Sequence, residues 1–259
     1  MTLRALAAVA LTATLVACDS GASFDADNPP PVIASAAFDL GAGSFPDEPA
    51  RTGVTARVGS NFVNASARVG IVTAVIGLHL ALPAAATEAA TEADPVVTDG
   101  VWTWASTADV FGTPVDVTLE AIADGSEIDW RLVSQRRGDE PGEPFVYYTA
   151  TTSLDGETGT WTLFNPDQDG PVLTASFDVR DLDDREVTFR VPAGRENGGS
   201  SVLYRTDGDA QTFDWLDQPE DERALIVWDR ASKAGSIEAD TYNGGEPACW
   251  DAALDNVAC

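Results

Sequence analysis

Histidine, lysine and cysteine are scarce: the 259-residue sequence contains one histidine, His79, one lysine, Lys233, and three cysteines. Catalytic Ser–His–Asp and Cys–His arrangements need a histidine base, and common zinc sites need several histidine or cysteine ligands. His79 stands in an apolar segment, where we favour a histidine satisfied at the core boundary over a ligand or base in a cavity. A P-loop and a G-x-G-x-x-G motif are also absent. We therefore expect no catalytic residue, no metal ion and no cofactor.

Positive charge is scarce as well. The sequence has 42 acidic residues against 15 lysines and arginines, which gives a formal net charge of −27. Such a chain repels phosphate backbones and anionic lipid surfaces, so we expect no nucleic-acid partner. Aspartate is twice as common as glutamate. This excess and the near absence of lysine indicate either adaptation to high salt or a GC-rich genome.

The N-terminus carries an apolar run that is too short to cross a membrane. Residues 5–17 contain only Ala, Leu, Val and Thr, and Arg4 precedes them. A spanning helix needs about 20 residues, whereas this length suits a signal peptide. The run ends in the letters LVAC at Cys18, and acidic and small residues follow.

This ending resembles the lipobox of bacterial lipoproteins. In that family the cysteine receives a diacylglyceryl group and becomes the first residue after cleavage. The resemblance implies that residues 1–17 are a signal peptide and that Cys18 is lipidated. It also implies a membrane-anchored protein of the bacterial cell envelope, on the periplasmic or outer surface. An ordinary signal peptide with a chance cysteine is the alternative.

The two remaining cysteines, Cys249 and Cys259, lie close together at the C-terminus. An oxidising compartment permits a disulfide between them. A redox pair is disfavoured because the C-x-x-C spacing is missing and no basic group lies nearby to lower a thiol pKa. We predict a structural disulfide that holds the C-terminal end in place.

The N-terminal third of the mature chain divides into a tether, a helix and a linker. Residues 18–53 are rich in Asp, Pro, Gly, Ala and Ser and are predicted to form a disordered acidic tether. A helix is predicted over residues 54–82, with Pro83 ending it and residues 83–100 forming a linker. From Val69 onward this helix is apolar on nearly every side, which is typical of a buried helix. A membrane span is disfavoured, because the apolar part is short and contains His79.

From Val101 onward the apolar residues recur at every second position, as in strands with one buried face. We expect about eleven strands, near residues 101–106, 115–121, 128–132, 144–152, 159–164, 173–179, 187–191, 201–206, 211–216, 224–229 and 236–242. Short Gly- and Asp-rich turns connect them, which favours antiparallel neighbours in a meander.

The predicted fold class is therefore mainly β. Residues 54–259 form one domain, in which an up-and-down meander makes a curled sheet or open barrel around the single N-terminal helix. This outline resembles the half-barrel class of bacterial carriers of lipoproteins and lipids. The resemblance is architectural, and no residue role is transferred from it.

Two acidic turns contain possible calcium ligands. The stretch NPDQDG, with Asn165, Asp167 and Asp169, resembles the start of a calcium loop, but Ser176 stands where the EF-hand pattern has glutamate. We interpret it as an acidic hairpin turn, and DLDDRE at residues 181–186 in the same way.

Seven tryptophans offer the remaining functional hint. Trp102, Trp104 and Trp228 are candidate ligand-binding residues if they line an exposed concave face, although core packing is favoured for each. We expect a non-catalytic binding protein for an apolar ligand, a glycan or an envelope partner. One alternative is a purely structural or interaction lipoprotein whose helix fills the sheet without a cavity. Another is a carboxylate-dependent glycoside hydrolase.

Overall fold

The computed structural model describes residues 28–33, 35–38, 45–46, 59–110, 112–136 and 143–259. The predicted signal peptide, the lipobox and Cys18 lie outside these residues, as does most of the predicted tether. Lipidation therefore stays a prediction.

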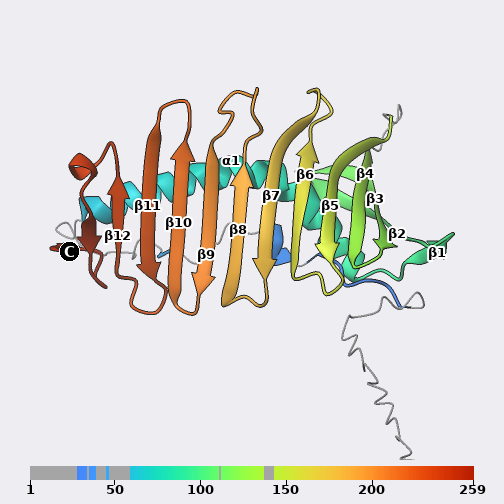
Figure 1. Cartoon of the computed structure of the whole chain (residues 1–259), viewed down its shortest axis with the longest axis horizontal. Coiled ribbons are helices and arrows are strands. Elements are labelled where there is room, and N and C mark those ends of the chain that lie inside the picture. Colours follow the sequence, from blue (N-terminus) through green and yellow to red (C-terminus); the bar gives the residue numbers. More distant parts are fainter. Residues whose placement is uncertain (1–27, 34, 39–44, 47–58, 111, 137–142) are drawn as a thin grey trace, which may run out of the picture.

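The described chain forms one antiparallel sheet of 14 strands, arranged in their order along the chain (Figure 1). The strands are β1 (Val96–Thr98), β2 (Val101–Val110), β3 (Thr113–Asp124), β4 (Glu127–Arg136), β5 (Phe145–Ser153), β6 (Thr158–Phe164), β7 (Pro171–Val179), β8 (Asp184–Arg190), β9 (Ser201–Asp207), β10 (Ala210–Asp217), β11 (Glu222–Asp229), β12 (Gly235–Ala239), β13 (Ala248–Trp250) and β14 (Asn256–Val257). β1 pairs only with β2 and β14 only with β13, so the sheet is open. The predicted mainly β meander is confirmed.

The eleven predicted strands correspond to β2–β12, and the sequence patterns missed β1, β13 and β14. These three strands have two or three residues each, too few for an alternation of period two to be recognised. They lie at the two edges of the sheet. Short edge strands offer little free backbone to another chain, which protects an open sheet from edge-to-edge association.

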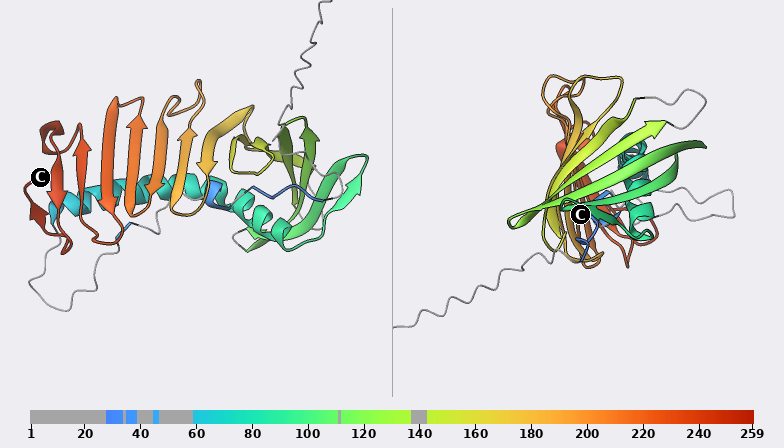
Figure 2. Two further views of the ribbon diagram at one scale, coloured as in Figure 1. Left: turned by 60° about the horizontal axis from the view of Figure 1, so that its bottom comes forward. Right: turned by 90° about the vertical axis from the view of Figure 1, so that its right-hand side faces the viewer.

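A single long helix, α1 (Ser60–Thr91), crosses one face of the sheet. Figure 2 shows α1 along that face, with the green strands at one end of the sheet curving around its C-terminal part. α1 contacts β2 and β3 at this end and β12–β14 at the other. Its inward side chains are buried and include Phe62, Ala65, Val69, Ile76 and Leu80.

The beginning of α1 is attached to the C-terminal strands. Asn61 Nδ2 donates a hydrogen bond to the carbonyl oxygen of Cys249 at 2.7 Å. Gly59 allows a close approach, since a Cβ there would lie 2.7 Å from the backbone nitrogen of Asn256. The predicted disulfide between Cys249 and Cys259 is formed. It links β13, which accepts the hydrogen bond from Asn61, covalently to Cys259.

The prediction that Pro83 ends the helix is wrong, because α1 continues to Thr91. A proline inside a helix leaves the carbonyl four residues earlier, here that of His79, without its N–H donor. The hydroxyl of Tyr147 on β5 lies 3.5 Å from this carbonyl oxygen and serves as the donor. In the predicted linker over 83–100, residues 83–91 are therefore helix and Val96–Thr98 form β1.

Parts of the predicted tether belong to the core, so that prediction is wrong for these residues. Ile33 and Phe38 are buried, and Phe38 ends the short 3-10 helix η1 (Ser35–Phe38), which contacts β7. The Phe38 ring packs 5.9 Å from that of Trp161, measured between centroids. Phe45 packs between Phe62 of α1 and the sheet. The N-terminal segment thus covers part of the inner face that α1 leaves open.

Candidate functional site: the outward side of α1 and the groove beside it

The outward side of α1 is apolar and exposed. Val63, Ile71, Val75 and Leu78 have 50%, 66%, 55% and 62% of their surface exposed. We call these four residues the exposed stripe of α1. The prediction that an all-apolar helix is buried is wrong here, because a single sheet contacts only one side of the helix. In the described part of the chain, α1 is the one helix that is long and apolar enough to cross a membrane. Core helices of soluble proteins can have the same length and composition.

A groove runs between α1 and the ends of β7–β10. Its apolar part has a volume of about 220 Å³. Its apolar lining residues are Ile71, Val72, Val75 and Ile76 of α1, Leu173 of β7, Phe189 of β8, Val191, Val202 of β9 and Trp215 of β10. Polar and charged residues at the strand ends complete the lining: Arg190, Asn197, Ser200, Ser201 and Asp217. We call this feature the α1 groove. Since Ile71 and Val75 belong to both, the groove and the exposed stripe form one continuous apolar surface.

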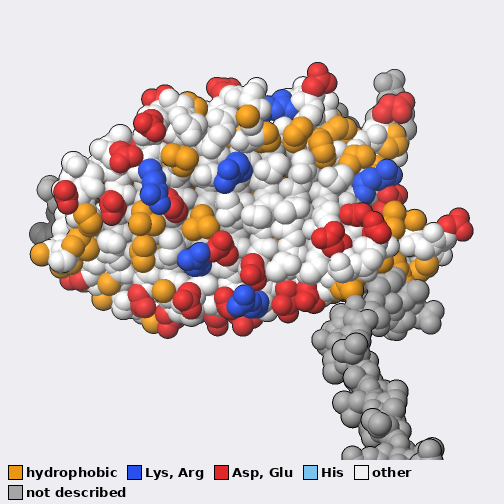
Figure 3. Space-filling model, in the orientation of Figure 1, with side chains coloured by type: hydrophobic (Ala, Val, Ile, Leu, Met, Phe, Trp, Pro, Cys, Tyr) orange, Lys and Arg blue, Asp and Glu red, His pale blue; other side chains and the backbone are white. Residues whose placement is uncertain are grey.

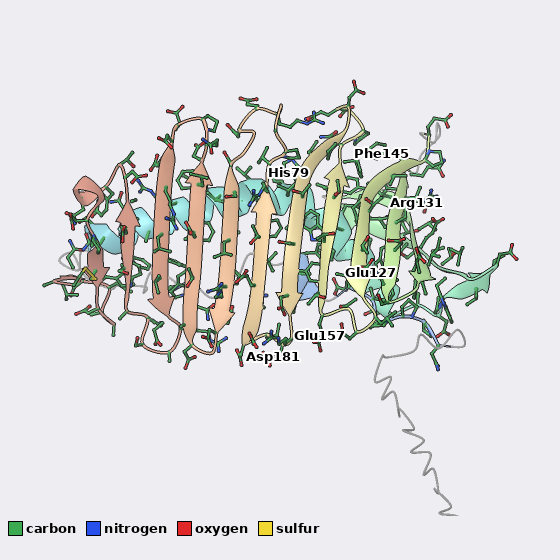
Figure 4. All side chains as sticks on the ribbon, in the orientation of Figure 1. His79, Glu127, Arg131, Phe145, Glu157 and Asp181 are labelled. Atoms are coloured by element: carbon green, nitrogen blue, oxygen red, sulfur yellow. A yellow bond between two sulfur atoms is a disulfide. The ribbon has the colours of Figure 1, made fainter. Side chains whose placement is uncertain are left out.

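The α1 groove continues into a more polar part of about 320 Å³, lined by His79, Gln168, Arg195, Glu196 and Asn197 among others. His79 lies on α1 behind the sheet (Figure 4). Its Nδ1 donates to the carbonyl oxygen of Val75 at 3.0 Å, which is the satisfied histidine that the sequence favoured.

Arg195 fixes the polar end of the groove. Its Nε donates to the carbonyl oxygen of Pro171 at 2.9 Å, and its Nη1 donates to Gln168 Oε1 at 3.1 Å. A third bond goes to the carbonyl oxygen of Asp169. These bonds join the β8–β9 connection to the β6–β7 turn. The groove wall is thus held in place before any ligand arrives.

The three tryptophans predicted to bind ligand are core residues instead. Trp102, Trp104 and Trp228 are 5%, 3% and 2% exposed. Trp104 stacks on Trp130 with ring centroids 5.9 Å apart, so no ligand can reach these rings. The prediction is wrong because these side chains point toward the helix. Trp215 was not among these candidates, but it is half-buried and lines the α1 groove. It lies near the end of β10, where α1 and the N-terminal segment no longer cover the inner face of the sheet.

The two acidic stretches are hairpin turns, as interpreted from the sequence. Asn165 Oδ1 accepts a bond from the backbone nitrogen of Asp167 at 2.9 Å, and Asp181 Oδ1 accepts one from Asp183 at 2.7 Å. Side-chain oxygens that cap their own turn are typical of aspartate and asparagine in hairpins. Within the described ranges, no group of three or more His, Cys, Asp or Glu side chains is arranged to hold a metal ion.

Comparisons of the chain with known protein families, with curated proteins and with solved structures found no match.

Proposed function

We propose that this chain is a lipid-anchored protein of the bacterial cell envelope that binds, without catalysis, an apolar segment of an envelope partner on the outward side of α1. The supporting observation is the continuity between the α1 groove and the exposed stripe. Val63 and Leu78 are fifteen residues apart, so this surface is roughly 22 Å long at 1.5 Å per residue. Exposed apolar surfaces of this kind mark interaction sites.

The openness of the surface favours a protein segment over a free lipid. Small-ligand pockets bury 70–90% or more of their ligand. Here Ile71 and Val75, which line the groove, are themselves more than half exposed. An amphipathic helix that places apolar residues at every third and fourth position fits such a surface. The net charge of −27 favours a partner that is neutral or basic on its polar side.

The two alternatives receive less support. A purely structural role does not account for a groove with a preorganised polar end. A glycoside hydrolase needs a carboxylic acid with a raised pKa as its proton donor. Two turn carboxylates are unsuited to that role: the pKa of Asp155 is lowered, mainly by a hydrogen bond from Ser153, and that of Asp229 is lowered, mainly by the backbone N–H of Ser232. Both carboxylates belong to turns.

Binding of the neutral dye Nile red tests the apolar surface, since an anionic dye would be repelled. We expect the full chain to bind the dye and the Ile71→Ser/Val75→Ser variant to lose most of the signal. The matched control is Leu182→Ser/Val227→Ser, which removes two exposed aliphatic residues away from α1, one in the β7–β8 turn and one on β11. Absent dye binding, or equal losses in the two variants, would contradict the proposal.

A photo-cross-linking residue tests the occupant. Placed at Leu78 in cells, it should attach to an apolar segment of one envelope protein, and at Val227 on the opposite face of the sheet it should not. Cross-linking to lipid, or lipid extracted from the purified protein, would show that the surface binds an acyl chain and not a protein segment.

The lipid anchor is tested separately. Cys18→Ala should abolish incorporation of labelled palmitate, and persistent labelling would contradict the proposed anchor.

A further inference from the structure

The outer face of the sheet, opposite α1, carries a concentration of hydroxyl side chains in its middle. These are Thr149 and Thr151 of β5, Thr160 and Thr162 of β6, Thr174 and Ser176 of β7, and Thr188 of β8. Figure 3 shows this face, with its central part free of charged and apolar side chains. Since threonine is common in strands, composition alone would not distinguish this region.

The strand register places these hydroxyl residues in two straight rows across the sheet. One row pairs Thr149 with Thr162 and Thr162 with Thr174. The other row pairs Thr151 with Thr160, Thr160 with Ser176 and Ser176 with Thr188. Neighbouring members of a row are about 4.8 Å apart, and the two rows are separated by roughly 6.8 Å.

The rows form the floor of a shallow trough, because their side chains are shorter than those around them. Two adjoining depressions of about 370 and 400 Å³ share Thr160 and Thr162, and the first is also lined by Glu120, Ile122 and Asp129 at its β3–β4 end. Arg131, on β4, lies at one end of the trough (Figure 4) and pairs with Glu120 at 2.9 Å. Arg190 lines the other end. We call this feature the hydroxyl trough.

Most hydroxyls in the trough are available to a ligand. Thr151 donates to Asp129 at 2.9 Å and Thr174 to the carbonyl oxygen of Arg190 at 3.3 Å. Within the described residues, the side chains of Thr149, Thr160 and Thr162 make no hydrogen bond. Ser176 and Thr188 have none to the described chain either. Each free hydroxyl is both a donor and an acceptor.

The neighbouring part of the same face is built differently. On β8–β11 the outward side chains form ion pairs, Glu186 with Arg205 and Asp214 with Arg223. The acidic chain thus keeps a hydroxyl-lined strip on the outward face of β5–β8, with charged side chains only at its two ends, while it places paired charges beside it. The difference lies within one continuous sheet, so strand propensity does not explain it.

We propose that the hydroxyl trough binds a neutral polysaccharide chain laid across strands β4–β8. Uncharged hydroxyl groups on both sides match in donors and acceptors, and an acidic glycan would be repelled by the net charge of −27. Strand addition by a peptide is excluded, since β5–β8 have paired neighbours on both sides.

Affinity electrophoresis of the full chain tests this inference. The gels contain dextran, laminarin, hydroxyethyl cellulose or mannan as neutral polymers, and alginate as the acidic comparison. We expect at least one neutral polymer, and not alginate, to retard the wild-type protein. Thr160→Val/Thr162→Val should weaken this binding at least about fivefold, since each lost hydrogen bond contributes about 1 kcal/mol.

The matched control is Thr212→Val/Ser236→Ala, which removes two hydroxyls from β10 and β12 on the same face outside the trough. It should bind like the wild type, and all variants should unfold at the same urea concentration. Failure of every neutral polymer, stronger retardation by alginate, or unchanged binding of the valine variant would each overturn the inference. Because the trough and the α1 groove are on opposite faces, this outcome is independent of the proposed partner binding.

Discussion

The two sides of α1 are both apolar but have opposite surroundings. The inward side, with Phe62, Val69 and Leu80, is buried against the sheet, while Ile71 and Leu78 on the outward side are exposed. No described residue of α1 between Arg68 and Glu88 is charged, so charge does not separate the two sides. Whether an apolar side chain of α1 is buried therefore depends on whether another part of the chain packs against it. An apolar side that the chain leaves uncovered indicates a surface for something else.

The sharpest test compares two leucines on the same helix. Leu80 is 3% exposed and Leu78 is 62% exposed. We expect Leu80→Ala to lower the free energy of unfolding by about 2–5 kcal/mol through the lost burial and the cavity left behind. Leu78→Ala should change it by no more than about 0.5 kcal/mol. Urea unfolding followed by tryptophan fluorescence measures both, and equal losses would show that the outward side is covered.

The disulfide tests how firmly the beginning of α1 is attached. Cys249→Ser/Cys259→Ser removes the bridge next to the Asn61 contact. We expect a loss of roughly 2.5–3 kcal/mol, because the bridge restricts the unfolded chain. Reduction of the wild type should produce the same loss. Unchanged stability after either treatment would mean that the C-terminal strands are held by packing alone.

Alkaline pH tests the dry interior beneath α1. Burial raises the pKa of Tyr148 well above its ordinary 10.0, and the nearby Thr87 hydroxyl opposes this only in part. The unfolded chain therefore loses its Tyr148 proton above pH 10 while the folded protein keeps it. Stability is complete below pH 10 and should fall above it, by about 1.4 kcal/mol at pH 11. Tyr148→Phe should remove this share of the loss, and an unchanged slope would contradict a buried phenol.

The smallest expected effect concerns the bond that carries α1 past Pro83. Tyr147→Phe removes the donor to the His79 carbonyl and should cost about 0.5–1.5 kcal/mol. In a Pro83→Ala background the helix supplies its own donor, so the same change should cost less. A double-mutant cycle measures this difference. Additive effects would show that Tyr147 does not compensate for the proline.

Prediction from the sequence succeeded where the pattern is local. Alternating apolar residues identified β2–β12, and Gly- and Asp-rich turns indicated that each strand pairs with the next. It failed where distant groups decide. Tyr147 supplies the donor that the carbonyl of His79 loses at Pro83, and Phe38 packs against Trp161 of the sheet. Trp215 and Trp228 share the inward face of the sheet, and only their distance from the edge of the cover makes one accessible.

The sequence by itself determined the meander, the presence of one apolar helix and the pairing of Cys249 with Cys259, because strand alternation, turn chemistry and short-range cysteine spacing act over a few residues. Only the tertiary structure decided which side of α1 is covered, where the α1 groove opens and how the threonines align into rows. The rows depend on the register of several consecutive hairpins, which the alternation of apolar residues alone does not set. The covered side of α1 and the α1 groove depend on contacts between distant parts of the chain, such as α1 and strands β7–β10. A short window of sequence contains one partner of each such contact and not the other.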